Sequence, residues 1–209
     1  MNLTLLNARR RWVLGLGLSI TGPLAALSAC SRTSTPSFHS IDITGAPYGH
    51  DFRLRAPDGS ERTVADFRGK AVLVFFGFTQ CPDVCPTALT RAADVKRLLG
   101  KQGERFLAVF ITVDPERDTP AILREYTQAF DPSFIGLSGD LAQTQKTASD
   151  FRVHYAKVPT GSSYTMDHTA TSYVFDPTGT LRLAVSHATT ATDLAADISA
   201  LLKDAATGP

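Results

Sequence analysis

A continuous apolar run leads directly into two closely spaced cysteines, and this junction limits the possible folds more than any other part of the chain. Residues 71–76 read Ala-Val-Leu-Val-Phe-Phe, which is typical of a strand buried on both faces. Cys81 and Cys85 follow within the sequence Cys-Pro-Asp-Val-Cys-Pro. Apolar residues at helical spacing then continue to residue 99, where Gly100 supplies a stop. The sequence therefore predicts a buried strand, a cysteine-bearing turn and a helix in direct succession.

The rest of the chain alternates short strands with amphipathic helices. Thr119 followed by Pro120 predicts a helix start, because a threonine cap and a proline in the first turn suit the unbonded amides there. Residues 164–169 are predicted as a loop that enters a strand. The order βαβ, α, β-hairpin, α predicts an α/β thioredoxin-like fold with an N-terminal β-hairpin extension. The predicted strands cover residues 41–43, 51–54, 62–64, 71–76, 106–113, 134–137, 171–175 and 181–185, and the predicted helices cover 86–99, 120–130, 141–153 and 190–202.

The first 29 residues have the pattern of an export signal. Arginines at positions 9–11 precede an uncharged stretch over residues 12–29, and a basic start followed by apolar and small residues directs secretion. The stretch ends Leu-Ser-Ala-Cys, which resembles a bacterial lipobox and predicts lipidation of Cys30. A signal peptide cut near Ala29 and an uncleaved anchor are alternatives, and the arginine run also resembles a twin-arginine signal. Each of these places the rest of the chain outside the cytoplasm.

These features divide the chain into an export signal (1–29), a polar tether (30–37) and a thioredoxin-like domain (38–209). The whole chain has a net charge of +1. Residues 1–29 carry three arginines and no acidic residue, so the remainder has a net charge of −2. Binding to nucleic acid is not expected, because phosphate contacts need a clustered surplus of Lys and Arg.

Three cysteines are too few for a disulfide-stapled scaffold. Cys30 is accounted for as a lipid attachment site or as part of an anchor, which leaves the thiols of Cys81 and Cys85 to explain. Their spacing at a helix start lets the two sulfur atoms converge. The free amides and the dipole of a helix N-terminus stabilise a thiolate, so we expect the pKa of both thiols to be lowered. Paired thiolates favour copper(I) or zinc, but zinc usually takes four ligands and no third cysteine remains. A structural disulfide is the alternative.

One histidine is placed to complete a metal site. His168 lies just before the predicted strand 171–175, which a thioredoxin-like topology brings beside the cysteine turn. Two thiolates and an imidazole make a three-coordinate site that suits copper(I). We expect Asp167 to orient the imidazole as a hydrogen-bond acceptor, and Met166 to pack, although its thioether is a conceivable ligand. The other four histidines, for which surface or hydrogen-bonding roles are expected, are His39, His50, His154 and His187.

Three blocks of residues along the chain carry a resemblance to a known family, and they occur in the same order as in that family. They are Phe76-Gly77-Phe78-Thr79 with Cys81-Pro82-Asp83-Val84-Cys85-Pro86, then Val113-Asp114-Pro115-Glu116-Arg117-Asp118-Thr119-Pro120, then Asp167-His168 followed by Tyr173 and Asp176-Pro177-Thr178-Gly179. Together they resemble the Sco/SenC/PrrC family, over Phe38 to Leu202. The resemblance implies a thioredoxin-like fold with Cys81, Cys85 and His168 as copper ligands. Many members keep a transmembrane anchor, from which the lipobox-like end at Cys30 departs.

The resemblance implies a metallochaperone that delivers copper to the Cu(A) centre of cytochrome c oxidase during assembly. The implied partners are the copper-binding subunit of the oxidase, other periplasmic copper chaperones, and the membrane through an N-terminal lipid or anchor. The implied location is the bacterial cell envelope, membrane-tethered and facing the periplasm. One copper ion per chain is expected, as copper(I) and also as copper(II), since nitrogen and thiolate ligands suit both.

Two enzymatic alternatives use the same cysteines. A thiol-disulfide oxidoreductase would reduce the copper-ligand cysteines of the oxidase subunit with the Cys81/Cys85 pair, so enzymatic activity stays open. That activity needs no imidazole, and His168 with the widened cysteine spacing favours copper. A peroxiredoxin-like peroxidase is disfavoured, because no Pro-x-x-x-Thr-x-x-Cys pattern precedes either cysteine.

Overall fold

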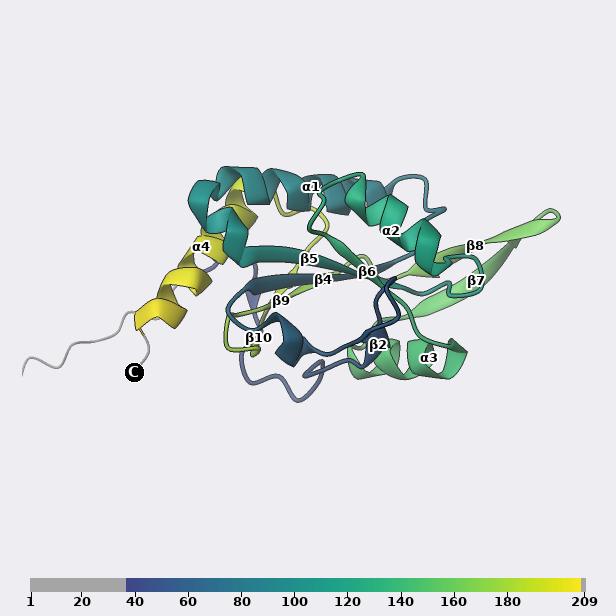
Figure 1. The fold of residues 1–209 in the computed structure, drawn as a ribbon, viewed down its shortest axis with the longest axis horizontal. Helices are drawn as coiled ribbons and strands as arrows, with labels where there is room; N and C mark the ends of the chain where they lie inside the picture. The colour runs from purple at the N-terminus through teal and green to yellow at the C-terminus, as the bar shows by residue number, and fades with distance from the viewer. Residues whose placement is uncertain (1–36, 208–209) are drawn as a thin grey trace, which may run out of the picture. The chain divides into compact units, whose positions relative to one another are not determined.

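A six-stranded mixed sheet forms the centre of the domain in the computed structural model, which describes residues 37–207 (Figure 1). β4 (Ala71–Gly77) and β5 (Phe106–Thr112) pair in parallel, and every residue of both strands is buried. The apolar run that dominates the sequence is therefore a central strand, as predicted. The strand order is β1-β10-β9-β4-β5-β6, and the remaining strands of this sheet are β1 (Ile41–Asp42), β6 (Ile135–Leu137), β9 (Ser172–Phe175) and β10 (Leu181–Val185).

Helices cover both faces of this sheet. α1 (Val84–Leu98) and α2 (Pro120–Gln128) connect parallel strands and lie on the same face, whereas α3 (Leu141–Asp150) lies on the opposite face (Figure 1). α4 (Ala191–Thr207) packs against α1. This layering is the predicted thioredoxin-like arrangement, and among the described helices none is both long and apolar enough to cross a membrane.

Aromatic side chains fill the space between the layers. On the side of α3, the ring of Phe151 lies 5.3 Å from that of Phe76 and 5.5 Å from that of Tyr173. On the other side, Phe110 contacts Phe75 in the sheet, at 6.1 Å between ring centroids. A fully buried phenylalanine contributes about 1.5–3 kcal/mol of transfer free energy, so these rings are a main source of stability.

The segment before β4 forms the predicted N-terminal hairpin, but the hairpin is shorter. β2 (Leu54–Arg55) and β3 (Glu61–Arg62) pair in antiparallel fashion around Gly59. Val64 does not extend β3. It begins a 3₁₀ turn, η1 (Val64–Phe67), because Thr63 and Asp66 form a capping box there.

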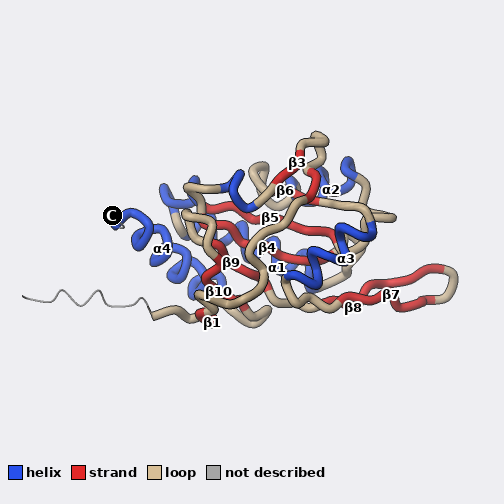
Figure 2. Tube along the Cα trace, turned by 90° about the horizontal axis from the view of Figure 1, so that it is seen from below, coloured by secondary structure: helices blue, strands red, loops and turns tan. Residues whose placement is uncertain are grey.

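The predicted loop at residues 164–169 is wrong, because most of it belongs to a β-hairpin. β7 (Tyr155–Thr160) and β8 (Ser163–His168) pair with each other in a separate two-stranded sheet. The hairpin projects from one end of the domain, as Figures 1 and 2 show. Its two-residue turn starts at Gly161, whose φ of 60° suits glycine in a tight hairpin.

The helix boundaries follow from local capping. α2 begins as predicted, with the Thr119 hydroxyl accepting a hydrogen bond from the amide of Ile122. α3 ends at Asp150, earlier than the predicted residue 153. The reason is that Arg152 adopts a left-handed φ of 56° and the Val153 amide donates to the Ala148 carbonyl, as in a Schellman stop. The predicted export signal and lipidated Cys30 lie outside the described residues.

Candidate metal centre

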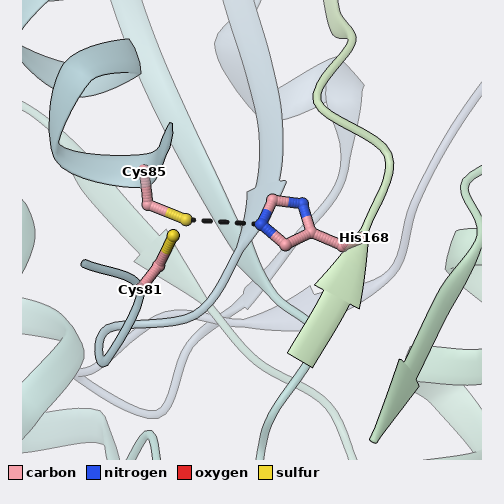
Figure 3. A group of neighbouring side chains, drawn as sticks. All are labelled: Cys81, Cys85 and His168. Atoms are coloured by element: carbon pink, nitrogen blue, oxygen red, sulfur yellow. Dashed lines mark hydrogen bonds between the residues drawn. The ribbon is translucent and has the colours of Figure 1, made fainter. Parts of the chain in front are cut away.

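The two cysteines lie at the junction between β4 and α1, but only one of them is helical. Cys81 sits in the turn before the helix, where its amide donates to the Phe78 carbonyl at 3.2 Å. Cys85 occupies the first turn of α1 and is completely buried. The predicted convergence of the two sulfur atoms is therefore confirmed, but it does not come from a shared helical face, because the turn folds Cys81 back toward Cys85 (Figure 3). Both thiols are free.

His168 joins the cysteines from a distant part of the sequence. It is the last residue of β8, and its Nε2 atom lies 3.5 Å from the Cys85 sulfur (Figure 3). One ligand atom from each of Cys81, Cys85 and His168 lies within 4.8 Å of the other two. The structure thus brings together the three side chains that the sequence selected.

The imidazole is oriented by the backbone instead of by Asp167. Its Nδ1 atom lies 3.1 Å from the Thr169 carbonyl oxygen. Since a carbonyl can only accept, this contact puts the ring proton on Nδ1 and leaves the Nε2 lone pair facing Cys85. Asp167 is exposed and, as the neighbouring residue in a strand, it points to the opposite face. The expected hydrogen bond from the imidazole to Asp167 is replaced by the one to Thr169.

Aromatic rings enclose the imidazole. Phe75 and Phe78 each present an edge or face to His168 at 5.9 Å between ring centroids. Burial lowers the pKa of His168, so the neutral form that binds metals is favoured. Met166 is buried in the hydrophobic core, in agreement with its expected packing role.

Burial also reverses the prediction for Cys85. The helix N-terminus was expected to lower its pKa, but removal from water raises the pKa of the Cys85 thiol. The Phe78 backbone hydrogen bond opposes this rise, and the negative charges of Cys81 and Asp118 add to it. Desolvation outweighs the helix terminus because Cys85 is 0% exposed. In the metal-free protein Cys85 is therefore a thiol.

Gly77 leaves the space that the Cys85 sulfur occupies. A Cβ atom at position 77 would lie 2.6 Å from that sulfur and 2.9 Å from a ring carbon of Phe110. Cβ atoms in proteins essentially never come this close to a non-bonded atom, so any side chain at this position would displace the sulfur. The glycine at the end of β4 is thus part of the site.

The second sequence block holds the cysteine turn in place, which the sequence did not reveal. The buried carboxylate of Asp118 accepts hydrogen bonds from the Thr79 amide, the Thr79 hydroxyl and the Thr112 hydroxyl. Burial raises the pKa of Asp118, and these donors oppose that rise. The carboxylate therefore ties the turn before Cys81 to the end of β5. The family resemblance drew attention to residues 113–120, but no local sequence pattern predicted the contact between Asp118 and Thr79.

The donor set favours a soft, low-coordinate metal ion. Two thiolates and a neutral imidazole match copper(I), which accepts three ligands, better than they match zinc, which prefers four. A pair of free thiols at this separation is also able to close a disulfide after a small movement. The geometry therefore fits both metal binding and thiol redox chemistry.

Comparisons with known proteins give matches in sequence and in fold. The family model described as SCO1/SenC matches residues 42–203. The SCO2-like protein of Rickettsia felis is 40% identical over 134 residues, which are 63% of this chain and 65% of that relative, just under two thirds of its length. A structure of Bradyrhizobium japonicum ScoI with copper bound is 43% identical, covers 72% of this chain and 97% of its own, and superposes with a TM-score of 0.66. The apo Sco1 protein of Thermus thermophilus is 38% identical, with 80% and 99% coverage and a TM-score of 0.69.

Proposed function

The chain belongs to the SCO1/SenC family, and from this premise we propose that it is a copper metallochaperone with Cys81, Cys85 and His168 as ligands. The main support for this proposal is that the two sulfur atoms and one imidazole nitrogen lie within 4.8 Å of one another. The copper-bound relative from Bradyrhizobium japonicum supports copper as the metal. One ion binds per chain, as copper(I) and also as copper(II).

Copper is the cargo, and the cysteine pair controls its loading. Copper(I) binds the thiolate forms, so the thiol protons of Cys81 and Cys85 are released as the ion enters. Oxidation of the pair to a disulfide removes both soft ligands and prevents loading. Ligand exchange with thiolates of an acceptor then transfers the ion. We propose the copper-binding subunit of cytochrome c oxidase as that acceptor, for assembly of its Cu(A) centre.

The proposed setting is the bacterial cell envelope, facing the periplasm. Residues 1–29 would direct export, Cys30 would carry a lipid, and residues 30–37 would tether the domain to the membrane. Other periplasmic copper chaperones would supply the ion. Each of these assignments rests on the sequence.

A copper(I) titration tests the proposal. Reduced protein is titrated under anaerobic conditions against a competing chelator, beside His168→Ala and a Cys81→Ser/Cys85→Ser double variant. We expect one tightly bound copper, weakened by the histidine change and abolished by the double change. His154→Ala, which removes an exposed histidine, is the matched control and should bind as the wild type does. Equal copper(I) affinity of reduced and oxidised protein would contradict the proposed redox control.

A thiol-disulfide reductase acting on the oxidase subunit is the second candidate. The two free thiols and the thioredoxin-like fold favour it. Failure to compete for copper, together with a readily reducible Cys81–Cys85 disulfide, would select this function instead. His168 would then have no assigned role.

A further inference from the structure

One arginine contacts both segments that carry the candidate ligands. We propose that Arg117 is a positioning residue that holds His168 against the two cysteines. This inference rests on the proposed copper site and adds a residue outside the ligand set. We call Arg117, with its partners Gln80, Asp114 and Tyr164, the arginine bridge.

The guanidinium of Arg117 spans the gap between the cysteine turn and the hairpin. Its Nη1 atom donates to the side-chain oxygen of Gln80, the residue before Cys81, at 3.1 Å. The same nitrogen donates to the Tyr164 carbonyl at 2.8 Å, and Tyr164 lies in β8 with His168. Arg117 is thus hydrogen-bonded to a neighbour of one ligand and to the strand that bears another.

Tyr164 adds two more contacts to the arginine bridge. The Arg117 guanidinium carbon lies 3.7 Å from the centroid of the Tyr164 ring, a close cation–π contact. The Tyr164 hydroxyl donates to Asp114 at 2.9 Å, and Asp114 also pairs with the Nε atom of Arg117. Arginine, tyrosine and aspartate therefore form a closed ring of interactions.

The Arg117–Asp114 pair at the centre of the arginine bridge is shielded from water, unlike an ordinary surface ion pair, whereas Gln80 at the edge of the bridge is exposed. The side chains of Arg117 and Asp114 are 17% and 1% exposed. By contrast, Lys157 and Glu116, which link the same hairpin to the same loop, are each 46% exposed. Exposed pairs contribute little, whereas shielded, hydrogen-bonded pairs are costly to break. The shielded Arg117–Asp114 pair therefore contributes more to the position of the strand than the exposed Lys157–Glu116 pair does, although Lys157 also lies 4.7 Å from the centroid of the Tyr164 ring.

The hairpin needs such an attachment. β7 and β8 hydrogen-bond to each other and form a sheet separate from the central one. An isolated two-stranded hairpin is marginally stable in water, so its angle to the domain depends on side-chain contacts. Because His168 is the last residue of β8, movement of this strand moves the imidazole relative to the cysteines.

A double-mutant cycle on the full chain tests this role. Copper(I) affinity is measured by chelator competition for wild type, Arg117→Gln, His168→Ala and the double variant. We expect Arg117→Gln to weaken binding about tenfold to a hundredfold, as for other residues that orient a ligand. In the His168→Ala background the same change should have almost no effect, because Arg117 acts through His168. An equal loss in both backgrounds, or no loss in either, overturns the proposal.

A copper-free measurement provides an independent readout. Hydrogen exchange of the amides in residues 155–168 should accelerate in Arg117→Gln while exchange in β4 and β5 stays slow. Arg97→Gln is the matched control, since it removes an exposed arginine paired with Asp94 on α1. It should leave hairpin exchange and copper affinity as in the wild type. Unchanged hairpin exchange in Arg117→Gln contradicts the proposal.

Tyr164→Phe covers the case in which Arg117→Gln fails to fold. It keeps every charge and the stacked ring and removes one hydroxyl bond to Asp114, so we expect about a two- to tenfold loss of copper affinity. An unchanged affinity in Tyr164→Phe counts against the bridge. If wild-type protein itself binds no copper, the proposed function fails, and hairpin exchange alone decides whether Arg117 holds β8 in place.

Discussion

Cys85 experiences two opposing influences on its ionisation. It lies in the first turn of α1, where free amides favour a thiolate, yet it is completely buried and burial raises its pKa. The second influence is larger, so Cys85 would have to release a proton in order to bind copper(I) as proposed. The neutral imidazole of His168, by contrast, has no proton to give up at Nε2.

Copper(I) affinity should therefore rise with pH. Each thiol proton displaced by the metal adds about a tenfold gain in affinity per pH unit while the thiol pKa lies above the solution pH. Burial lowers the pKa of His168 from 6.5, so its protonation does not compete above that value. Chelator competition between pH 6.5 and pH 8.5, corrected for the chelator's own protonation, measures the slope. A flat profile would show that Cys85 is already ionised before copper arrives.

A second prediction at the residue scale concerns the effect of a side chain at Gly77 on stability. The Cβ atom of Gly77→Ala would meet the Cys85 sulfur at 2.6 Å, and such overpacking destabilises a core by about 1–3 kcal/mol. The loss of unfolding free energy, measured with urea, should shrink in a Cys85→Ala background because that sulfur is then absent. An equal loss in both backgrounds would assign the clash to Phe110 instead.

At the scale of elements, the β7–β8 hairpin shows what sequence reasoning missed. Residues 160–163 read Thr-Gly-Ser-Ser, and a two-residue turn beginning with glycine is a known hairpin signal. The flanking strands are largely exposed, so they lack the apolar alternation that identified the other strands. The position of His168 was nevertheless predictable, because it depends on the order of the main strands.

The contacts of Arg117 and Asp118 were not predictable, for a different reason. Arg117 meets Gln80 and Tyr164 across 37 and 47 residues of sequence, and Asp118 meets Thr79 across 39. No periodic pattern records which polar residues will meet after folding. The strand, the cysteine turn and α1 were predicted because each depends on neighbouring residues.

The hairpin turn can be loosened without touching the site. Gly161→Ala places a side chain at a φ of 60°, which costs about 1–2 kcal/mol. We expect faster amide exchange in residues 155–168 and weaker copper binding through His168, with little change in β4 and β5. Gly59→Ala is the matched control, since its φ is 84° and its turn joins β2 to β3. Weaker copper binding in Gly59→Ala as well would indicate general destabilisation.

At the scale of the whole molecule, the site joins parts of the domain that are otherwise separate. Cys81 and Cys85 flank the start of α1, which belongs to the main α/β layers, while His168 belongs to the outlying hairpin. A metal ion bound to all three therefore adds a cross-link that the unfolded chain lacks.

Copper(I) should consequently stabilise the reduced protein against heat. A ligand at a hundredfold excess over its Kd adds about 2.7 kcal/mol, and for a domain of this size that raises Tm by about 5–11 °C. The shift should persist in His154→Ala, decrease in His168→Ala and disappear in the Cys81→Ser/Cys85→Ser variant. A shift of full size in the double variant would place the bound copper elsewhere.

The three candidate ligands differ in exposure, so the site is open to solvent on one side only. Cys85 is sealed inside the core, whereas Cys81 and His168 are each half-buried at its surface. In the proposed transfer, a visiting thiolate would approach the ion from the side of Cys81 and His168. The ion would then enter and leave by the same route, and the bond to the buried Cys85 would be the last to break.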